Sequence, residues 1–184
     1  MRAHHDAHFA SYVSKLNAAL PALPAPPVRD DHALKRLLRR LPHVQPPALR
    51  AQIRNNGGGY LNHKHFFSCM TPGGAPLPPQ SALAQRIHSQ FGSFHTFETL
   101  FLDAARTLFG SGFVWLVRDA QQLRIVQYAN QDNPALHGTV PVLACDCWEH
   151  AWYYQYGPNK AAYFAEWWKL IDWPAVCRYY EGKA

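Results

Sequence analysis

The stretch ACDCWEHAWYY, at residues 144–154, joins a short apolar run to a segment rich in aromatic side chains. It places a carboxylate, Asp146, four positions before an imidazole, His150. Where a strand turns into a helix, two side chains with this spacing can point at one centre. A buried carboxylate is costly unless a cationic group shares its site. The stretch therefore predicts half of a metal site, and the other half has to come from elsewhere in the chain.

The composition predicts a folded protein of one domain, or of two small halves that share a core. Of the 184 residues, 48% are hydrophobic and 14% aromatic, and no long apolar run is present that could span a membrane. The four cysteines contain no C-x-x-C pair, so a zinc spacing is absent and a reducing compartment is expected. The net charge of +6 fits a small anionic substrate or nucleic acid and decides between neither.

Helical patterns dominate the first 70 residues. Apolar residues recur at helical spacing near the start, and His4, His8 and Tyr12 form a second stripe one turn apart from each other. Asp30 or Asp31 can cap a second helix. The face of this helix opposite its leucines is basic and carries Lys35, Arg36, Arg39 and Arg40.

A third helix is predicted to begin at Pro46-Pro47 and to end at residues 55–57, where the sequence is NNG. Three glycines, at residues 57–59, then precede a helical segment that contains His63 and His65. Because these two histidines are two positions apart on a helix, only one of them is expected to face a site.

Residues 71–80, TPGGAPLPPQ, are predicted to be a linker between two domains. Two helices should follow it, then strands at residues 113–118, 123–129 and 139–145, and finally helices at 148–156, at 160–170 and near the C-terminus. The order predicts an all-helical half, residues 1–70, followed by an α+β half, residues 81–184.

The candidate ligands all have ordinary alternative roles. Most of the 11 histidines are expected at the surface, and Cys145 and Cys147 are expected to pack as small apolar groups. His4 and His8 could share a metal, or one could bind while the other supports it. A set of three histidines and one aspartate suits a redox-active first-row metal, and zinc hydrolysis is the main alternative chemistry.

Five segments, in order, resemble motifs of the iron/manganese superoxide dismutases. They are HHDAHFASY at residues 4–12, GGGYLNH at 57–63, GSGFVWL at 110–116, NQD at 130–132 and DCWEHAWY at 146–153. The similarity runs from His4 to about Tyr180. The resemblance implies the α+β fold of that family, in which an N-terminal α-helical hairpin domain precedes a C-terminal α/β domain with a three-stranded antiparallel sheet.

The resemblance also implies a set of site residues. Manganese or iron would be held by His4, His63, Asp146 and His150, and the late position of the amide, Gln131, resembles the manganese pattern. Gln131 and Tyr12 would link to the solvent ligand of the metal, with His8 behind Tyr12. The wall of the site would be formed by Phe67, Trp115 and Trp148, and contacts across a dimer interface would be made by Glu149 and Tyr153.

The implied function is that of an antioxidant oxidoreductase, a superoxide dismutase that converts superoxide to O₂ and H₂O₂ by alternating M(III)/M(II) redox. Its partners would be superoxide and either an identical or a related subunit, with no membrane contact. A mitochondrial location is expected, and the cytoplasm is the alternative.

An alternative function follows from two departures. Against the family pattern, the segment that usually leads into the first-ligand helix is expected to be absent, and the second helix is more basic than a dismutase needs. Superoxide-dismutase-like proteins also serve as structural subunits of the small subunit of the mitochondrial ribosome, where activity is dispensable. In that role Lys35, Arg36, Arg39 and Arg40 would contact rRNA beside ribosomal proteins. The ordinary interpretation of this helix is a solvated face, and the complete ligand set favours the dismutase.

Overall fold

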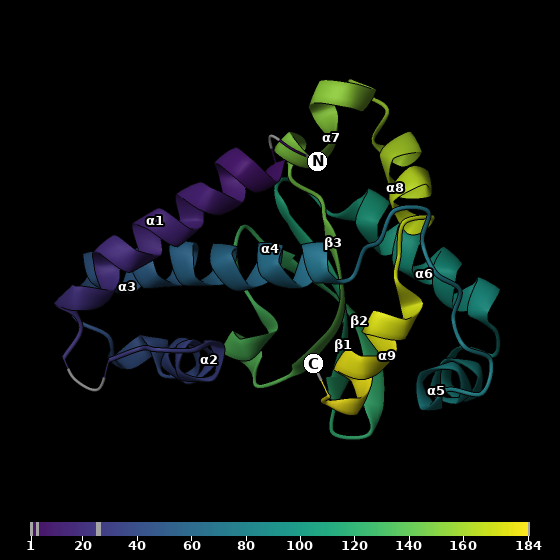
Figure 1. Ribbon diagram of the computed structural model, residues 1–184, viewed down its shortest axis with the longest axis horizontal. Helices are drawn as coiled ribbons and strands as arrows, with labels where there is room; N and C mark the ends of the chain where they lie inside the picture. The colour runs from purple at the N-terminus through teal and green to yellow at the C-terminus, as the bar shows by residue number, and fades with distance from the viewer. Residues whose placement is uncertain (1, 3, 25–26, 184) are drawn as a thin grey trace.

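The computed structural model describes residues 2, 4–24 and 27–183, which form a helical N-terminal lobe beside a lobe built on a small sheet (Figure 1). The N-terminal lobe begins with a π-helical turn, η1 (His4–Phe9), that continues into α1 (Ala10–Ala19). It continues through η2 (Leu20–Ala22), α2 (Asp31–Arg39), η3 (Leu41–His43), α3 (Pro47–Gln52), η4 (Ile53–Gly57) and α4 (Gly58–Ser68).

Local sequence explains where several of these helices begin. The side chain of Asp30 accepts a hydrogen bond from the amide of Ala33 at 2.7 Å, which caps α2 as predicted. Ser81 and Ser93 cap the next two helices in the same way. The leucines of α2 then turn inward, and Leu34 and Leu38 join Leu16 and Leu61 in the core of the N-terminal lobe.

The predicted helix end at residues 55–57 is wrong. The chain remains helical from α3 through the π-helical turn η4 into α4, and Gly57 has a φ of −68° and a ψ of −43°, which are α-helical values. The glycines serve close packing instead of termination, because a Cβ on Gly58 would lie 2.0 Å from the Gln131 carbonyl oxygen. Tertiary contact thus overrides the local preference of NNG to end a helix.

The C-terminal lobe centres on an antiparallel sheet in the order β2-β1-β3. Its strands are β1 (Gly112–Asp119), β2 (Gln122–Ala129) and β3 (Val140–Asp146), with the short helix η5 (Pro134–His137) between the last two. The helices are α5 (Ala82–Phe91), α6 (Phe94–Thr107), α7 (Glu149–Tyr156), α8 (Lys160–Trp168) and α9 (Trp173–Glu181). The predicted α+β class with a three-stranded antiparallel sheet is confirmed.

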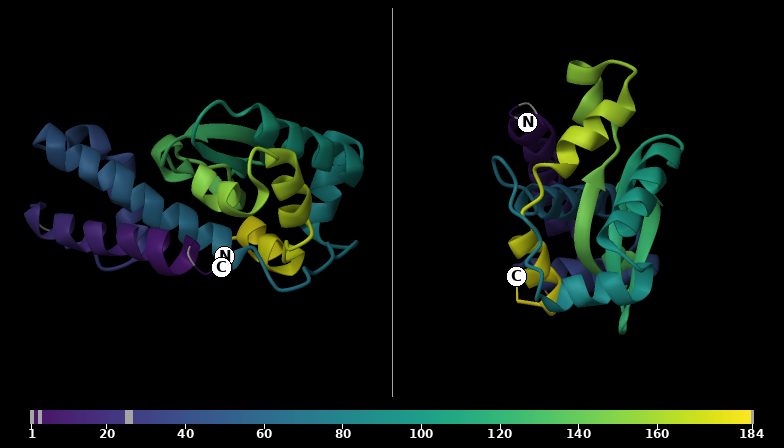
Figure 2. Two further views of the ribbon diagram at one scale, coloured as in Figure 1. Left: turned by 90° about the horizontal axis from the view of Figure 1, so that it is seen from above. Right: turned by 90° about the vertical axis from the view of Figure 1, so that its right-hand side faces the viewer.

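Helices cover both faces of this sheet, so that its central strand is almost entirely buried (Figure 2). Helices α4 and α9 pack on β3, whereas α5 and α6 pack on β2. The register pairs Phe113 with Asp146, which brings the last residue of β3 to the edge where α4 and the N-terminus meet. All four cysteines are buried and free. None of the helices in the described part of the chain is long and apolar enough to cross a membrane.

Candidate metal centre

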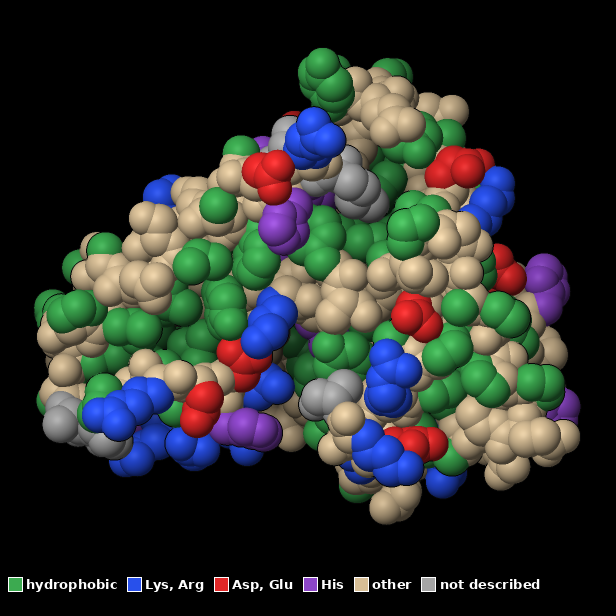
Figure 3. Space-filling model, in the orientation of Figure 1, with side chains coloured by type: hydrophobic (Ala, Val, Ile, Leu, Met, Phe, Trp, Pro, Cys, Tyr) green, Lys and Arg blue, Asp and Glu red, His purple; other side chains and the backbone are tan. Residues whose placement is uncertain are grey.

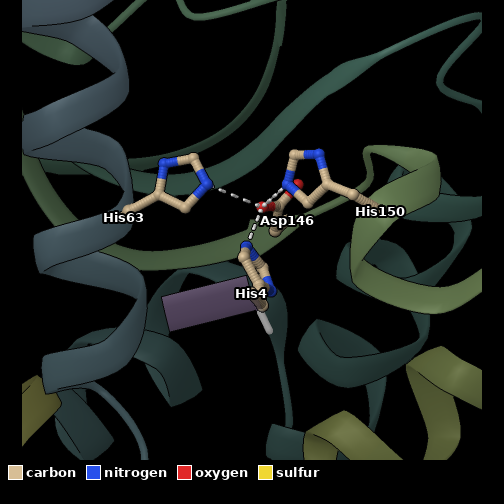
Figure 4. Close-up of side chains that lie close together, drawn as sticks. All are labelled: His4, His63, Asp146 and His150. Atoms are coloured by element: carbon tan, nitrogen blue, oxygen red, sulfur yellow. Dashed lines mark hydrogen bonds and ion pairs between the residues drawn. The ribbon is translucent and has the colours of Figure 1, made fainter. Parts of the chain in front are cut away.

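Three imidazoles converge on one carboxylate oxygen at the junction of the two lobes (Figure 4). The Nε2 atoms of His4, His150 and His63 lie 3.0, 3.2 and 3.6 Å from Oδ2 of Asp146. One potential ligand atom from each residue lies within 4.8 Å of the others. The site is buried, with His150 the most accessible member at 12% exposure. Such a cluster of donors matches the preference of a first-row metal for imidazole and carboxylate.

Four separate elements supply these side chains. His4 stands in the π-helical turn η1, His63 on α4, Asp146 at the end of β3 and His150 in the first turn of α7. π-helical turns are rare and occur frequently at functional sites, and here one of them carries His4 while a second, η4, leads into the helix of His63. The centre therefore depends on the docking of both lobes.

The surroundings of Asp146 keep its carboxyl group ionised. Its Oδ1 accepts a hydrogen bond from the backbone N–H of Trp148 at 2.9 Å, which leaves Oδ2 facing the three imidazoles. Burial acts to raise the pKa of this carboxyl group, but the hydrogen bond with His150 and the closeness of the His4 ring hold the pKa well below its usual range.

The surroundings of His63 keep its imidazole neutral, with the lone pair on Nε2. Its Nδ1 lies 2.7 Å from the carbonyl oxygen of Gly59, which can only accept, so Nδ1 carries the proton and Nε2 carries the lone pair. Burial lowers the pKa of His63 to about 4. The Nε2 atoms of His4 and His63 are buried without a hydrogen-bond partner. Buried, unpartnered nitrogen atoms aimed at a carboxylate fit the ligand shell of a metal ion.

Gln131 and Tyr12 meet beside this cluster. The Gln131 Nε2 donates to the Tyr12 hydroxyl oxygen at 2.9 Å. Gln131 follows Asn130, whose positive φ of 54° turns the chain after β2, and Asn130 accepts a hydrogen bond from the Trp148 indole N–H at 3.1 Å. On the other side, the Arg54 guanidinium binds both carboxylate oxygens of Asp132, at 2.7 and 2.6 Å. The segment that carries the amide is thus held to both lobes.

Of the three predicted wall residues, two lie beside candidate ligands and the third lies farther away. The Phe67 ring lies 5.1 Å from the ring of His4, and Trp148 stacks at 5.6 Å on His150. Trp115 does not line the site: its ring packs against His65 and Phe113, and Phe113 is the residue that packs on His63, at 5.7 Å. Phe113 is the strand partner of Asp146, whereas Trp115 pairs with Ala144, so the register places Phe113 two residue pairs closer to the site.

His8 also occupies a different place from the predicted one. Its ring stacks on His150 with a centroid separation of 4.3 Å, instead of lying behind Tyr12. The reason is the π-helical turn, which shifts residues 4–9 relative to the α-helical stripe that the spacing suggests. Burial, followed by the neighbouring His150 and His4, lowers the pKa of His8.

Comparison with known proteins gives the same assignment as the geometry. The family model of the iron/manganese superoxide dismutase alpha-hairpin domain matches residues 1–71, and that of the C-terminal domain matches residues 79–179. This chain belongs to the iron/manganese superoxide dismutase family.

Curated members of the family resemble the chain along nearly its whole length. A manganese superoxide dismutase of Leptolyngbya boryana is 43% identical over 99% of this chain and 74% of its own length. Those of Bordetella pertussis and Thermus aquaticus are each 39% identical, over 98% and 99% of this chain and 84% and 87% of their own lengths. The ribosomal alternative finds no support in these relatives, which are named as dismutases.

The basic residues predicted to contact RNA lie on α2 and at its C-terminal end, outside the elements that carry the candidate ligands. Arg36 and Arg39 are exposed on α2, Arg40 is exposed at its C-cap, and Lys35 is half-buried. Lys and Arg side chains gather over this region at the lower left of Figure 3. None of the four takes part in an ion pair within the described chain. This arrangement is that of a solvated face.

Two residues near the centre were missed by the sequence-based prediction. Asn62 and Asn133 are 0% and 2% exposed, and both are hydrogen-bonded toward Gln131. Asn62 directly precedes His63 and Asn133 lies two positions after Gln131, so proximity to predicted site residues was a signal for both. Their amides carry no pattern of their own, because Asn is common in turns and caps.

Proposed function

We propose that this protein is a superoxide dismutase that converts two superoxide ions and two protons to one O₂ and one H₂O₂. The observation that carries the proposal is the convergence of three buried imidazole nitrogens on Oδ2 of Asp146. The family and the names of its curated relatives agree with it.

Four side chains would hold the ion, which is manganese or iron: His4, His63, Asp146 and His150. When bound, the ion supplies one-electron exchange between its 3+ and 2+ states. The ligands add a single negative charge, so the site stays attractive to an anion. The apolar rings of Phe67, Phe113 and Trp148 keep the site poor in water, which strengthens electrostatic interactions inside it.

Proton supply is the task of the outer residues. Because Gln131 donates to the oxygen of Tyr12, the hydroxyl proton of Tyr12 is not used in that bond. Burial raises the pKa of Tyr12, so this hydroxyl stays protonated at neutral pH. Tyr12 lies against His63, with ring centroids 5.0 Å apart, and can therefore offer its proton at the centre.

One preparation tests this function. Manganese and iron are measured per chain in the purified protein, and superoxide dismutation is assayed for the wild type and for Asp146→Ala. We expect close to one metal ion per chain and activity in the wild type, and loss of both in the variant. A protein that binds neither metal and leaves superoxide decay unchanged would contradict the proposal.

We also propose that two copies of this chain, or this chain and a related subunit, pair through α7. Glu149, next to the ligand His150, is exposed, and Tyr153 and Tyr154 are 56% and 101% exposed. Exposed aromatic side chains beside a site are typical of an interface. Sedimentation of the wild type and of a Glu149→Ala, Tyr153→Ala variant tests the pairing: we expect a dimer and a monomer, and a monomeric wild type would refute it.

A further inference from the structure

We propose that Asn133, whose side-chain hydrogen bonds go to Asn62 and Ala135 and to no candidate metal ligand, is a positioning residue that fixes the direction of the Gln131 amide through Asn62. The inference rests on the proposed function for its effect on activity, whereas the link itself is a property of this fold. It assigns a role to a side chain that stands outside the metal centre.

A chain of hydrogen bonds runs from the backbone to Tyr12. The amide N–H of Ala135 donates to Oδ1 of Asn133 at 2.8 Å, and Nδ2 of Asn133 donates to Oδ1 of Asn62 at 2.7 Å. Nδ2 of Asn62 then donates to Oε1 of Gln131 at 3.0 Å, and Nε2 of Gln131 donates to Tyr12 at 2.9 Å. Each side-chain amide accepts on one side and donates on the other.

The direction of this chain is fixed by groups that cannot be reversed. A backbone N–H can only donate, so the Ala135 amide sets the oxygen of Asn133 toward itself and the NH₂ group of Asn133 toward Asn62. The carbonyl oxygen of Asp132 can only accept, and it lies 3.5 Å from Nδ2 of Asn62. Both ends therefore require Asn62 to present its NH₂ group to Gln131.

Burial makes the alternative direction expensive. Asn62, Gln131 and Asn133 are 0%, 3% and 2% exposed, so water cannot replace a lost partner. If the Gln131 amide turned over, its NH₂ group would face the NH₂ group of Asn62, and two buried donors would oppose each other. The amide of Gln131 consequently keeps its NH₂ group on Tyr12, and Tyr12 keeps its own proton for the centre.

The test separates this link from the other role of Asn133, which is to cap η5. Asn133→Ser keeps a side-chain oxygen that can cap, but it is too short to reach Asn62. Gln131→Ala and the double variant Asn133→Ser, Gln131→Ala complete a double-mutant cycle. Thr139→Val is the matched control, because Thr139 Oγ1 donates to the Pro134 carbonyl of the same segment without touching the amide chain.

Two quantities are measured for each protein with its metal: dismutation per bound metal ion, and the urea concentration at the midpoint of unfolding. We expect Asn133→Ser to bind metal normally and to lose about tenfold in activity per metal ion, as partners outside the ligand shell do. In the Gln131→Ala background the same change should cause no further loss. Thr139→Val should retain full activity per metal ion, and its effect on unfolding should add to that of Gln131→Ala.

Unfolding gives a readout that does not depend on catalysis. Asn133 and Gln131 share no direct hydrogen bond, so a cap alone predicts additive effects, whereas the link through Asn62 predicts non-additive ones. Full activity per metal ion in Asn133→Ser, or an undiminished loss in the Gln131→Ala background, would overturn the proposal. If the wild type does not dismutate superoxide, the proposed function fails. The link is then judged from unfolding alone, and additive effects of Asn133→Ser and Gln131→Ala would reject it.

Discussion

Gln131 donates a hydrogen bond to the hydroxyl of Tyr12 at 2.9 Å, although 119 positions separate the two residues in the chain. The bond joins α1 of the N-terminal lobe to the segment that follows β2 of the sheet. It forms at the edge of a centre whose four candidate ligands also come from both lobes. The candidate metal centre and the proposed proton supply therefore lie at one interface.

Replacing the Tyr12 hydroxyl tests the proton supply. In Tyr12→Phe the metal ligands are untouched, so we expect unchanged metal content and dismutation reduced about tenfold per metal ion. The reduction should be largest at high superoxide concentration, where proton delivery limits turnover. Stopped-flow decay of superoxide measures this directly, and a variant as fast as the wild type would show that Tyr12 supplies no proton.

Removing the charge of Asp146 tests the ligand set. Asp146→Asn keeps the shape of the side chain but offers the three imidazoles a neutral group, and we expect manganese and iron content to fall by at least tenfold. Asp119→Asn is the control, because Asp119 pairs with Arg124 on an exposed turn at 3.0 Å. Equal metal content in the two variants would remove Asp146 from the ligand set.

Adding one methyl group tests the close approach of α4 to Tyr12. A Cβ on Gly59 would lie 2.4 Å from the Tyr12 ring, so Gly59→Ala should displace the ring, destabilise the fold by about 1–3 kcal/mol and lower activity per metal ion.

Gly57→Ala provides the comparison, since its Cβ would meet the ends of flexible leucine side chains, that of Leu34 at 3.2 Å and those of Leu16 and Leu38 at 3.7 Å. It should cost less stability and leave activity per metal ion unchanged. Urea unfolding and the dismutation assay on both variants measure the difference, and identical behaviour would contradict the predicted contact.

Acid should weaken the metal-free fold partly through His65. Burial lowers the pKa of His65 to about 4 from the ordinary value of 6.5. Below pH 6.5 His65 binds a proton in the unfolded chain but stays neutral in the folded chain, so the free energy of unfolding falls as the pH drops toward 4. We expect His65 to account for about 2 kcal/mol of the loss between pH 7 and pH 5.

The variant His65→Leu isolates this contribution, because leucine does not titrate. Unfolding by urea at pH 7 and pH 5 should show a smaller loss in the variant than in the wild type. His63, whose pKa is also about 4, contributes in the same direction and is present in both proteins. Equal losses in the two proteins would mean that His65 is protonated in the folded state.

The sequence by itself determined the family, the fold class and the site candidates. Short motifs carry this information because each one holds several chemically demanding residues at fixed spacing: Asp146 and His150 four apart, three glycines before His63, and an amide after a turn. The helix cap at Asp30 was also predictable from the local sequence, since a cap acts within one turn of its own helix.

Only the tertiary structure decided how these pieces meet. The helix continues through residues 55–57, and His8 stacks on His150. Phe113, and not Trp115, packs against His63. Asn133 is joined to Gln131 through Asn62. Each outcome depends on contacts between residues distant in the chain, where packing and buried hydrogen bonds outweigh local propensity. Spacing along a chain predicts which side chains share a face, but the docking of two lobes determines what that face touches.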